Sequence, residues 1–174
     1  MQIEIDKLSE AGQPFAHTYS PAELPLEDER ARLLADAQVR GQISRKRQRV
    51  RIHGQVATEV EVYCDRCLAP VAMPLKAEFD VSYDPPDAIE ETDSTELQPD
   101  DLETSVYTGE TIDLDELVRE QLLLALPLRS LCREECKGLC PTCGVDLNKH
   151  SCACAQQQTD PRWAGLAALK ESDE

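Results

Sequence analysis

The sequence predicts an α+β protein in which an antiparallel β-meander sheet, open or barrel-like, is covered by one long helix and followed by a cysteine-rich module. Three observations support this class: long stretches in which apolar and polar residues alternate, one amphipathic stretch with helical spacing, and a dense group of cysteines near the C-terminus. The chain has 174 residues, close to one ordinary domain. At 41% hydrophobic but only 4% aromatic residues, its core must be mostly aliphatic.

The first thirty residues carry short signals only. Ile3 and Ile5 fit one short strand and Phe15–Ser20 a second. The prolines of Pro21–Leu26 mark a loop.

Three long strands follow. Apolar residues occupy every second position of Ala35–Ile43, Val50–Cys64 and Val71–Tyr83, which is the period of a half-buried strand. A polar, basic turn, Ser44–Arg49, joins the first two strands, and the second connection is also short. Short connections favour antiparallel pairing in the order of the chain, hence a meander.

The next stretch, residues 84–104, is strongly acidic. Asp84 to Glu103 contains nine acids, three prolines and no base. We expect a solvated, mobile loop, because such a composition buries too little apolar surface to become ordered. The alternative is an acidic arm that gates or mimics RNA on a basic surface.

A helix is predicted after this loop. Asp113 is a good N-cap, and Glu116 completes an acidic variant of the capping box. Pro127 ends the helix. Its apolar stripe, which we expect to cover the open face of the sheet, consists of Leu114, Leu117, Val118, Leu122 and Ala125.

A second, short helix begins at Asp160 and Pro161, and its apolar stripe starts at Trp163. We therefore divide the chain into an α+β domain, residues 1–127, and a cysteine module with a C-terminal helix, residues 128–174.

The eight cysteines indicate metal or redox chemistry. No apolar run is long enough to cross a membrane, and Glu4 and Asp6 stand where a signal peptide would be basic and then apolar. We therefore expect a cytoplasmic protein whose thiols stay reduced. The cysteines are Cys64, Cys67, Cys132, Cys136, Cys140, Cys143, Cys152 and Cys154.

The spacing of the C-terminal cysteines is typical of zinc. Cys140 and Cys143 form a Cys-x-x-Cys turn followed by Gly144, and Cys152 and Cys154 follow shortly after. Tight turns of this form deliver two sulfur ligands each. His150 is a substitute ligand, although an exposed loop position suits it better.

Cys64 and Cys67 form a second Cys-x-x-Cys, at a hairpin tip that would present both thiols outward. The simplest hypothesis is that the chain binds two zinc ions. The first would be held by Cys64, Cys67, Cys132 and Cys136, and the second by Cys140, Cys143, Cys152 and Cys154. The alternatives are one zinc held within the six C-terminal cysteines, or a redox couple of Cys64 and Cys67. Four sulfurs leave no open coordination position, so such sites are structural.

Nothing else in the sequence resembles an active site. His17, His53 and His150 are scattered, and no glycine-rich phosphate loop occurs. We expect a protein that is not an enzyme and has no small-molecule substrate.

One segment departs from the net charge of −16. Arg40, Arg45, Lys46, Arg47, Arg49 and Arg51 lie close together without an acid between them. Exposed cations on strands suit an RNA backbone. The alternative is cross-strand pairing, in which Arg51 and His53 approach Glu78 and Asp80.

Several motifs together resemble the bacterial YceD family, the large ribosomal RNA subunit accumulation proteins. They are Cys64-Asp65-Arg66-Cys67 after a long strand, Leu122–Pro127 at the helix end, the segment Leu131–Asn148, the Cys152-Ala153-Cys154 triplet and Asp160-Pro161-Arg162. The resemblance implies a role in making or accumulating 23S ribosomal RNA during large-subunit assembly. It implies no catalytic residue.

We therefore expect a non-catalytic ribosome biogenesis factor that meets 23S rRNA, its precursor, or a large-subunit ribosomal protein. The rival functions are an RNA-processing hydrolase or nuclease, and a thiol-based redox sensor.

Overall fold

The computed structural model describes residues 1–86, 104–154 and 162. Most of the predicted acidic loop and the predicted C-terminal helix from Asp160 lie outside the described residues. The elements in chain order are β1 Gln2–Glu4, the 3-10 turn η1 Ile5–Lys7, β2 Gln13–Tyr19, β3 Ala31–Leu33, β4 Ala37–Lys46, β5 Arg49–Tyr63, β6 Pro70–Asp84, β7 Thr104–Val106, β8 Thr111–Asp113 and α1 Leu114–Leu124. None of the helices in this part of the chain has the length and apolarity to cross a membrane.

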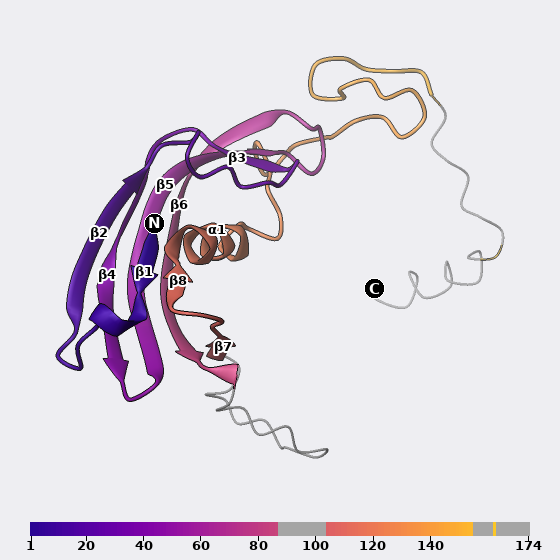
Figure 1. Cartoon of the computed structure of the whole chain (residues 1–174). Coiled ribbons are helices and arrows are strands. Elements are labelled where there is room, and N and C mark those ends of the chain that lie inside the picture. Colours follow the sequence, from indigo (N-terminus) through magenta and orange to yellow (C-terminus); the bar gives the residue numbers. More distant parts are fainter. Residues whose placement is uncertain (87–103, 155–161, 163–174) are drawn as a thin grey trace, which may run out of the picture.

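The strands form one large sheet and one small sheet. The large sheet has the order β2-β4-β5-β6-β7, with β3 paired to β5, and the small sheet pairs β1 with β8. The predicted antiparallel meander is confirmed as β4-β5-β6, whereas β7 joins β6 in parallel. The barrel-like alternative is wrong, because β2 and β7 are edge strands that do not pair with each other. Instead, the sheet curves around α1, which lies on its concave side (Figure 1).

Alternation along the strands assigns their two faces as predicted. Val50, Ile52, Val56 and Val60 of β5 face the core and are fully buried. Their neighbours along the strand point to the outer face of the sheet, where no helix of the described residues covers them. The long hairpin is paired from Val50 with Tyr83 to Tyr63 with Pro70.

Several local predictions need correction. The predicted turn Ser44–Arg49 is shorter, because β4 continues to Lys46 and β5 starts at Arg49. A two-residue hairpin turn needs left-handed backbone, which Arg47 adopts with φ 58°. Ile5 lies in η1 rather than in a strand, and Asp84 ends β6 rather than opening a loop. Strands β3, β7 and β8 were not predicted, because three residues are too few to show a period.

Helix α1 supplies much of the core. The Asp113 carboxylate accepts a hydrogen bond from the backbone N–H of Asp115 at 2.9 Å, which confirms the predicted N-cap. The helix is shorter than expected and ends at Leu124, since the residue before Pro127 is restricted to extended backbone. Its buried residues are Leu114, Leu117, Val118 and Leu122.

The loop after β2 closes the core. Leu24 is fully buried and Leu26 is 3% exposed, although their segment has no regular structure. The Arg119 guanidinium of α1 donates to the Pro25 carbonyl oxygen at 2.9 Å. The loop is therefore a fixed part of the packing.

Replacing Leu24 by Ala should lower the free energy of unfolding by about 2–5 kcal/mol, because the change leaves a cavity in the core. Urea unfolding measures it. The matched control is Leu128→Ala, since the side chain of Leu128 is fully exposed. Equal stability of the two variants would show that the loop is not packed.

Candidate metal centres

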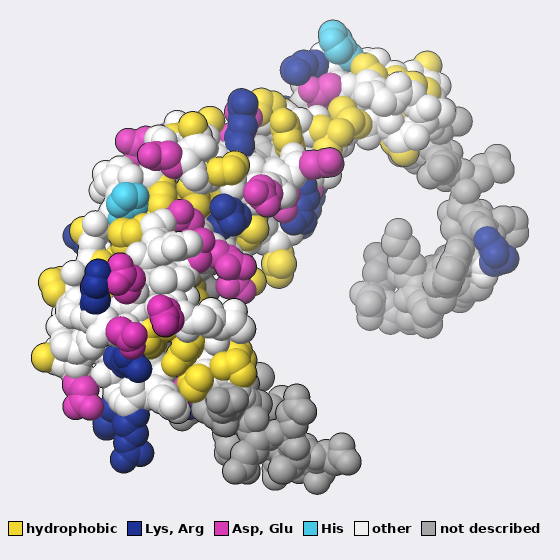
Figure 2. All heavy atoms as spheres, viewed as in Figure 1, with side chains coloured by type: hydrophobic (Ala, Val, Ile, Leu, Met, Phe, Trp, Pro, Cys, Tyr) yellow, Lys and Arg dark blue, Asp and Glu magenta, His cyan; other side chains and the backbone are white. Residues whose placement is uncertain are grey.

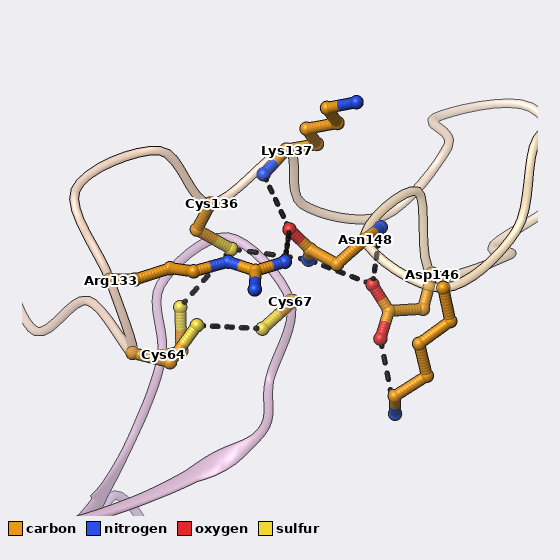
Figure 3. A network of polar contacts seen from close by, with 9 residues as sticks. Cys64, Cys67, Arg133, Cys136, Lys137, Asp146 and Asn148 are labelled. Carbon is orange, nitrogen blue, oxygen red and sulfur yellow. Dashed lines mark hydrogen bonds and ion pairs between the residues drawn. The ribbon is translucent and has the colours of Figure 1, made fainter.

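The first cysteine group joins two distant segments. Cys64 and Cys67 lie at the tip of the β5–β6 hairpin, and Cys132 and Cys136 follow α1. All four sulfurs lie within 4.8 Å of one another (Figure 3 shows the contacts around them). The Sγ atoms of Cys64 and Cys136 are 3.8 Å apart, and those of Cys67 and Cys132 are 3.7 Å apart. A tetrahedral zinc with Zn–S bonds of about 2.3 Å has sulfurs about 3.8 Å apart. The group therefore fits zinc.

The two residues between Cys64 and Cys67 hold the second segment in place. Asp65 exchanges two hydrogen bonds with Ser130: its N–H donates to the Ser130 carbonyl at 2.9 Å, and its carboxylate accepts from the Ser130 N–H at 2.6 Å. The Arg66 guanidinium donates to the carbonyl oxygen of Cys136 at 2.7 Å. Asp65 and Arg66 therefore hold the segment after α1 against the hairpin tip.

Gly138 allows the closest approach of the two segments. It has φ 75°, and a Cβ added there would lie 2.9 Å from the Arg66 carbonyl oxygen. That oxygen accepts from the N–H of Leu139 at 3.0 Å. A side chain at position 138 would push the segments apart.

Both Cys-x-x-Cys turns have the same backbone form. Gly144 N–H donates to the Cys140 carbonyl at 2.8 Å with φ 74°, and Leu68 N–H donates to the Cys64 carbonyl at 2.9 Å with φ 57°. The sequence indicated this turn only at Gly144. At the first turn a leucine adopts the left-handed backbone that favours glycine.

Backbone N–H groups aimed at sulfur stabilise thiolates. The N–H groups of Cys143 and Thr142 donate to Cys140 and lower the pKa of its thiol to about 6. Burial acts to raise the pKa of Cys64, but the N–H groups of Cys132, Cys67 and Arg66 outweigh it and lower this pKa to about 6. Thiolate is the form that binds metal.

The second group consists of Cys140, Cys143, Cys152 and Cys154, whose sulfurs also lie within 4.8 Å of one another. His150 is exposed and does not belong to it. The structure thus places the eight cysteines in the two groups of the two-site hypothesis, not in one C-terminal site. The outward orientation expected at the hairpin tip is wrong for Cys64, which is fully buried because the segment from Ser130 to Leu139 covers it. Zinc itself stays a prediction.

Asn148 was missed by the sequence reasoning. Its side-chain N–H donates to Cys136 Sγ at 3.4 Å, and its side-chain oxygen accepts from Arg133 at 2.8 Å and from the Lys137 N–H at 2.9 Å (Figure 3). Asp146 holds the same amide by accepting from it at 2.8 Å. Asn148 lies between the two Cys pairs of the second group, so it links the two groups. No sequence signal marks it, because an asparagine in a turn is common.

The basic residues divide into paired and unpaired sets. Arg49 forms an ion pair with Asp84 at 2.5 Å, and Arg51 with Asp80 at 2.5 Å. The second pair confirms the predicted cross-strand partner of Arg51. Arg45 forms an ion pair with Asp6 at 2.9 Å, and its guanidinium also donates to the Arg47 carbonyl oxygen at 3.0 Å.

Lys46 and Arg47 form no ion pair with any residue that the structure describes. Arg40 faces Gln55, whose side-chain oxygen accepts from its guanidinium at 2.7 Å when the amide is oriented to suit. Lys and Arg side chains project at the lower end of the sheet in Figure 2, where β4 and β5 join. The tip residues, Lys46 and Arg47, are therefore the most available cations of the predicted set.

Comparison with known proteins finds a matching protein family. The family model described as large ribosomal RNA subunit accumulation protein YceD matches residues 52–170. The uncharacterized protein Rv2926c of Mycobacterium tuberculosis is 34% identical over 71% of this chain and 58% of its own length. The chloroplastic large ribosomal RNA subunit accumulation protein YCED homolog 1 of Arabidopsis thaliana is 26% identical over 77% of this chain and 48% of its own length.

YlbN of Bacillus subtilis is 26% identical over 98% of this chain and 95% of its own length. The chain therefore spans about half the length of the mycobacterial and plant relatives and nearly all of YlbN. No solved structure matches the chain.

Protein purified without added metal should contain two zinc ions per chain. Replacing Cys140 and Cys143 by Ser should reduce this to one ion and loosen the second group while the sheet keeps its thermal transition, because Ser130 and Cys136, which bond to the hairpin tip, lie outside the second group. Elemental analysis and circular dichroism measure the two effects. A metal content near zero in the wild type would reject the zinc prediction.

Replacing Asn148 by Ala should weaken metal binding at the first group by about 10- to 100-fold, since groups that hold a ligand in place typically have effects of this size. Competition with a chromogenic chelator measures the affinity. Lys149→Ala is the matched control from the same turn, because the Lys149 side chain is exposed and, within the described residues, its ion pair is with Asp146 at 3.2 Å. If both variants release metal alike, the Asn148 contact has no role in binding.

Proposed function

Because the chain belongs to the YceD family of large ribosomal RNA subunit accumulation proteins, we propose that it is a non-catalytic assembly factor for the large ribosomal subunit. In this role it supports the synthesis, processing or accumulation of 23S rRNA. The observation that carries the non-catalytic part is the convergence of the cysteines into two groups of four sulfurs. A metal held by four sulfurs has no free position for substrate or water.

The proposed task of the metals is to hold the segment after α1 together. Within residues 128–154 the buried positions are Cys136, Gly138 and Cys140, so this segment buries no apolar side chain apart from cysteine. A segment without a core needs another source of folding free energy, and metal binding supplies it in small modules. When bound, zinc would be held by Cys64, Cys67, Cys132 and Cys136 in the first group and by the remaining four cysteines in the second.

The rival functions have weaker support. A hydrolase or nuclease that uses metal would need carboxylates that converge; in the described residues, the only groups of three or more Cys, His, Asp or Glu with converging ligand atoms are the two cysteine groups. A redox couple needs only Cys64 and Cys67, so it does not explain why the sulfurs of Cys132 and Cys136 lie next to them.

The proposed partner is 23S rRNA or its precursor, with a large-subunit ribosomal protein as a further partner on the same particle. Residues 128–154 are a poor place for phosphate. Each zinc with four thiolates carries a net charge of −2, and Glu134, Glu135 and Asp146 offset most of the nearby cations. The hairpin tip, Lys46 and Arg47, suits phosphate better. It lies N-terminal to the residues that the family model matches. Its charge and exposure, rather than family membership, support an RNA contact there.

A strain without its own family member should accumulate less 23S relative to 16S rRNA, and this chain should restore the ratio. Lys46→Gln with Arg47→Gln should bind pre-large-subunit particles several-fold more weakly in co-sedimentation and restore the ratio poorly. These two positions are chosen because Arg45 and Arg49 hold Asp6 and Asp84, so changing them would disturb the fold.

The matched control is Arg129→Gln with Lys137→Gln, which removes the same charge from exposed positions beside the cysteine groups. If only this control lost its association with the particles, the RNA contact would lie beside the cysteine groups and not at the hairpin tip. A ratio that this chain does not restore would contradict the proposed function.

A further inference from the structure

The outer face of the β4–β5 hairpin has a uniform chemistry that the metal centres do not explain. Its outward side chains pair in register across the two strands, as Gln42 with His53 and Ser44 with Arg51. They include cations, amides and a hydroxyl but no acid, in a chain of net charge −16. The ten residues are Gln38, Arg40, Gln42, Ser44 and Lys46 on β4 and Arg49, Arg51, His53, Gln55 and Ala57 on β5.

This face is hollowed along its length. Three shallow hollows of about 840, 550 and 560 Å³ lie over it. The first and second share Arg40, Gln55 and Glu78 as lining residues, and the first and third share Asp80. The hollows therefore form one trough that runs from Gln38 to Lys46 along the strands.

Most acids next to the trough lie on one side of it, and the exception, Glu10, lines its end near Lys46 from the loop before β2. Glu78, Asp80 and Asp84 belong to β6, and two of them already hold Arg51 and Arg49 in ion pairs. These pairs fix the positions of the two guanidinium groups. On the other side, β2 presents Pro14, Ala16 and Thr18, which carry no charge. A polyanion would lie over β2, β4 and β5, away from β6.

We infer that this trough binds a single-stranded segment of RNA, an inference that rests on the proposed function and specifies its RNA contact. Cations spaced along the strands suit successive phosphates, and the amides of Gln38, Gln42 and Gln55 can donate to and accept from base edges. Base edges are accessible in single strands, whereas the deep groove of an RNA duplex hides them from side chains. The ten-residue β4 is about 30 Å long, which accommodates several nucleotides.

The chemistry of the trough also determines how it binds. His53 is the only ring among the ten residues of this face, so base stacking contributes little and phosphate contacts dominate. The affinity should therefore be modest and fall steeply as salt is added.

The test uses the full chain and a fluorescein-labelled 12-nucleotide oligouridylate, with fluorescence anisotropy at several salt concentrations. Gln38→Glu with Gln42→Glu places two carboxylates of nearly unchanged shape in the trough. Binding should weaken by about tenfold, because the carboxylates repel phosphate and two amide donors are lost. The matched control, Gln2→Glu with Gln121→Glu, has the same net charge but lies on β1 and α1, and should bind like the wild type.

Circular dichroism and metal content should be unchanged in both variants, so that a loss of binding reports on the trough. Equal binding by the trough variant and the control would overturn the inference, and so would equal affinity for a 12-base-pair RNA duplex or for an oligoglutamate peptide. Each of these results would leave the association with large-subunit particles standing, because co-sedimentation measures it separately.

Discussion

Strand β5 presents its even-numbered residues from Val50 to Val62 to the core and its odd-numbered residues to the outer face. The rest of the molecule depends on this register, because a slip by one residue would exchange the two faces. The inward face gives α1 an aliphatic surface to cover, and it leads directly into Cys64, a buried member of the first cysteine group. The outward face carries Arg49, Arg51, His53 and Gln55. One strand therefore specifies the core, the position of one cysteine of the candidate metal centre and the surface that faces solvent.

The first cysteine group makes the hairpin tip an anchor for the rest of the chain. Cys64 and Cys136 are 72 residues apart in sequence, and bringing them together costs loop-closure entropy. The hydrogen bonds of Asp65 with Ser130 and of Arg66 with Cys136 offset part of this cost before any metal is considered. The sulfurs are already spaced as a tetrahedral zinc requires, so a metal would find its ligands in position. The second group is joined to the hairpin tip through the neighbouring Leu139, whose N–H donates to the Arg66 carbonyl oxygen, and to the first group through Asn148.

The charges of the protein are segregated rather than mixed. Acids dominate the composition, yet the outer face has none where β4 and β5 pair, from Gln38 to Lys46 and from Arg49 to Ala57, and the acids of β6 bind arginines at the border. Long-range repulsion between this chain and RNA would be screened by salt over about 10 Å, so only a local surface can make the contact. A charged sheet face also disfavours association with apolar surfaces of other chains. The same residues thus keep the open sheet apart from other chains and give it a polar surface suited to a polyanion.

The sequence by itself determined the features that arise within a few residues. Strict alternation identified β4, β5 and β6 and their faces, Asp113 marked the start of α1, and the Cys-x-x-Cys spacing identified pairs of ligands. These signals are readable because backbone geometry repeats every two or 3.6 residues. The acidic stretch was equally plain, and its first residue, Asp84, ends β6 in an ion pair with Arg49.

Only the tertiary structure decided which distant groups meet. It brought Cys64 and Cys67 next to Cys132 and Cys136, whereas the cysteine spacing alone was also consistent with a single C-terminal site. It buried Leu24 in a segment whose prolines indicate a loop, and it gave Arg45 and Arg49 the partners Asp6 and Asp84. The physical reason is that local periods depend on a few neighbouring torsions. Which partners meet across the chain depends on how all the elements close around one core.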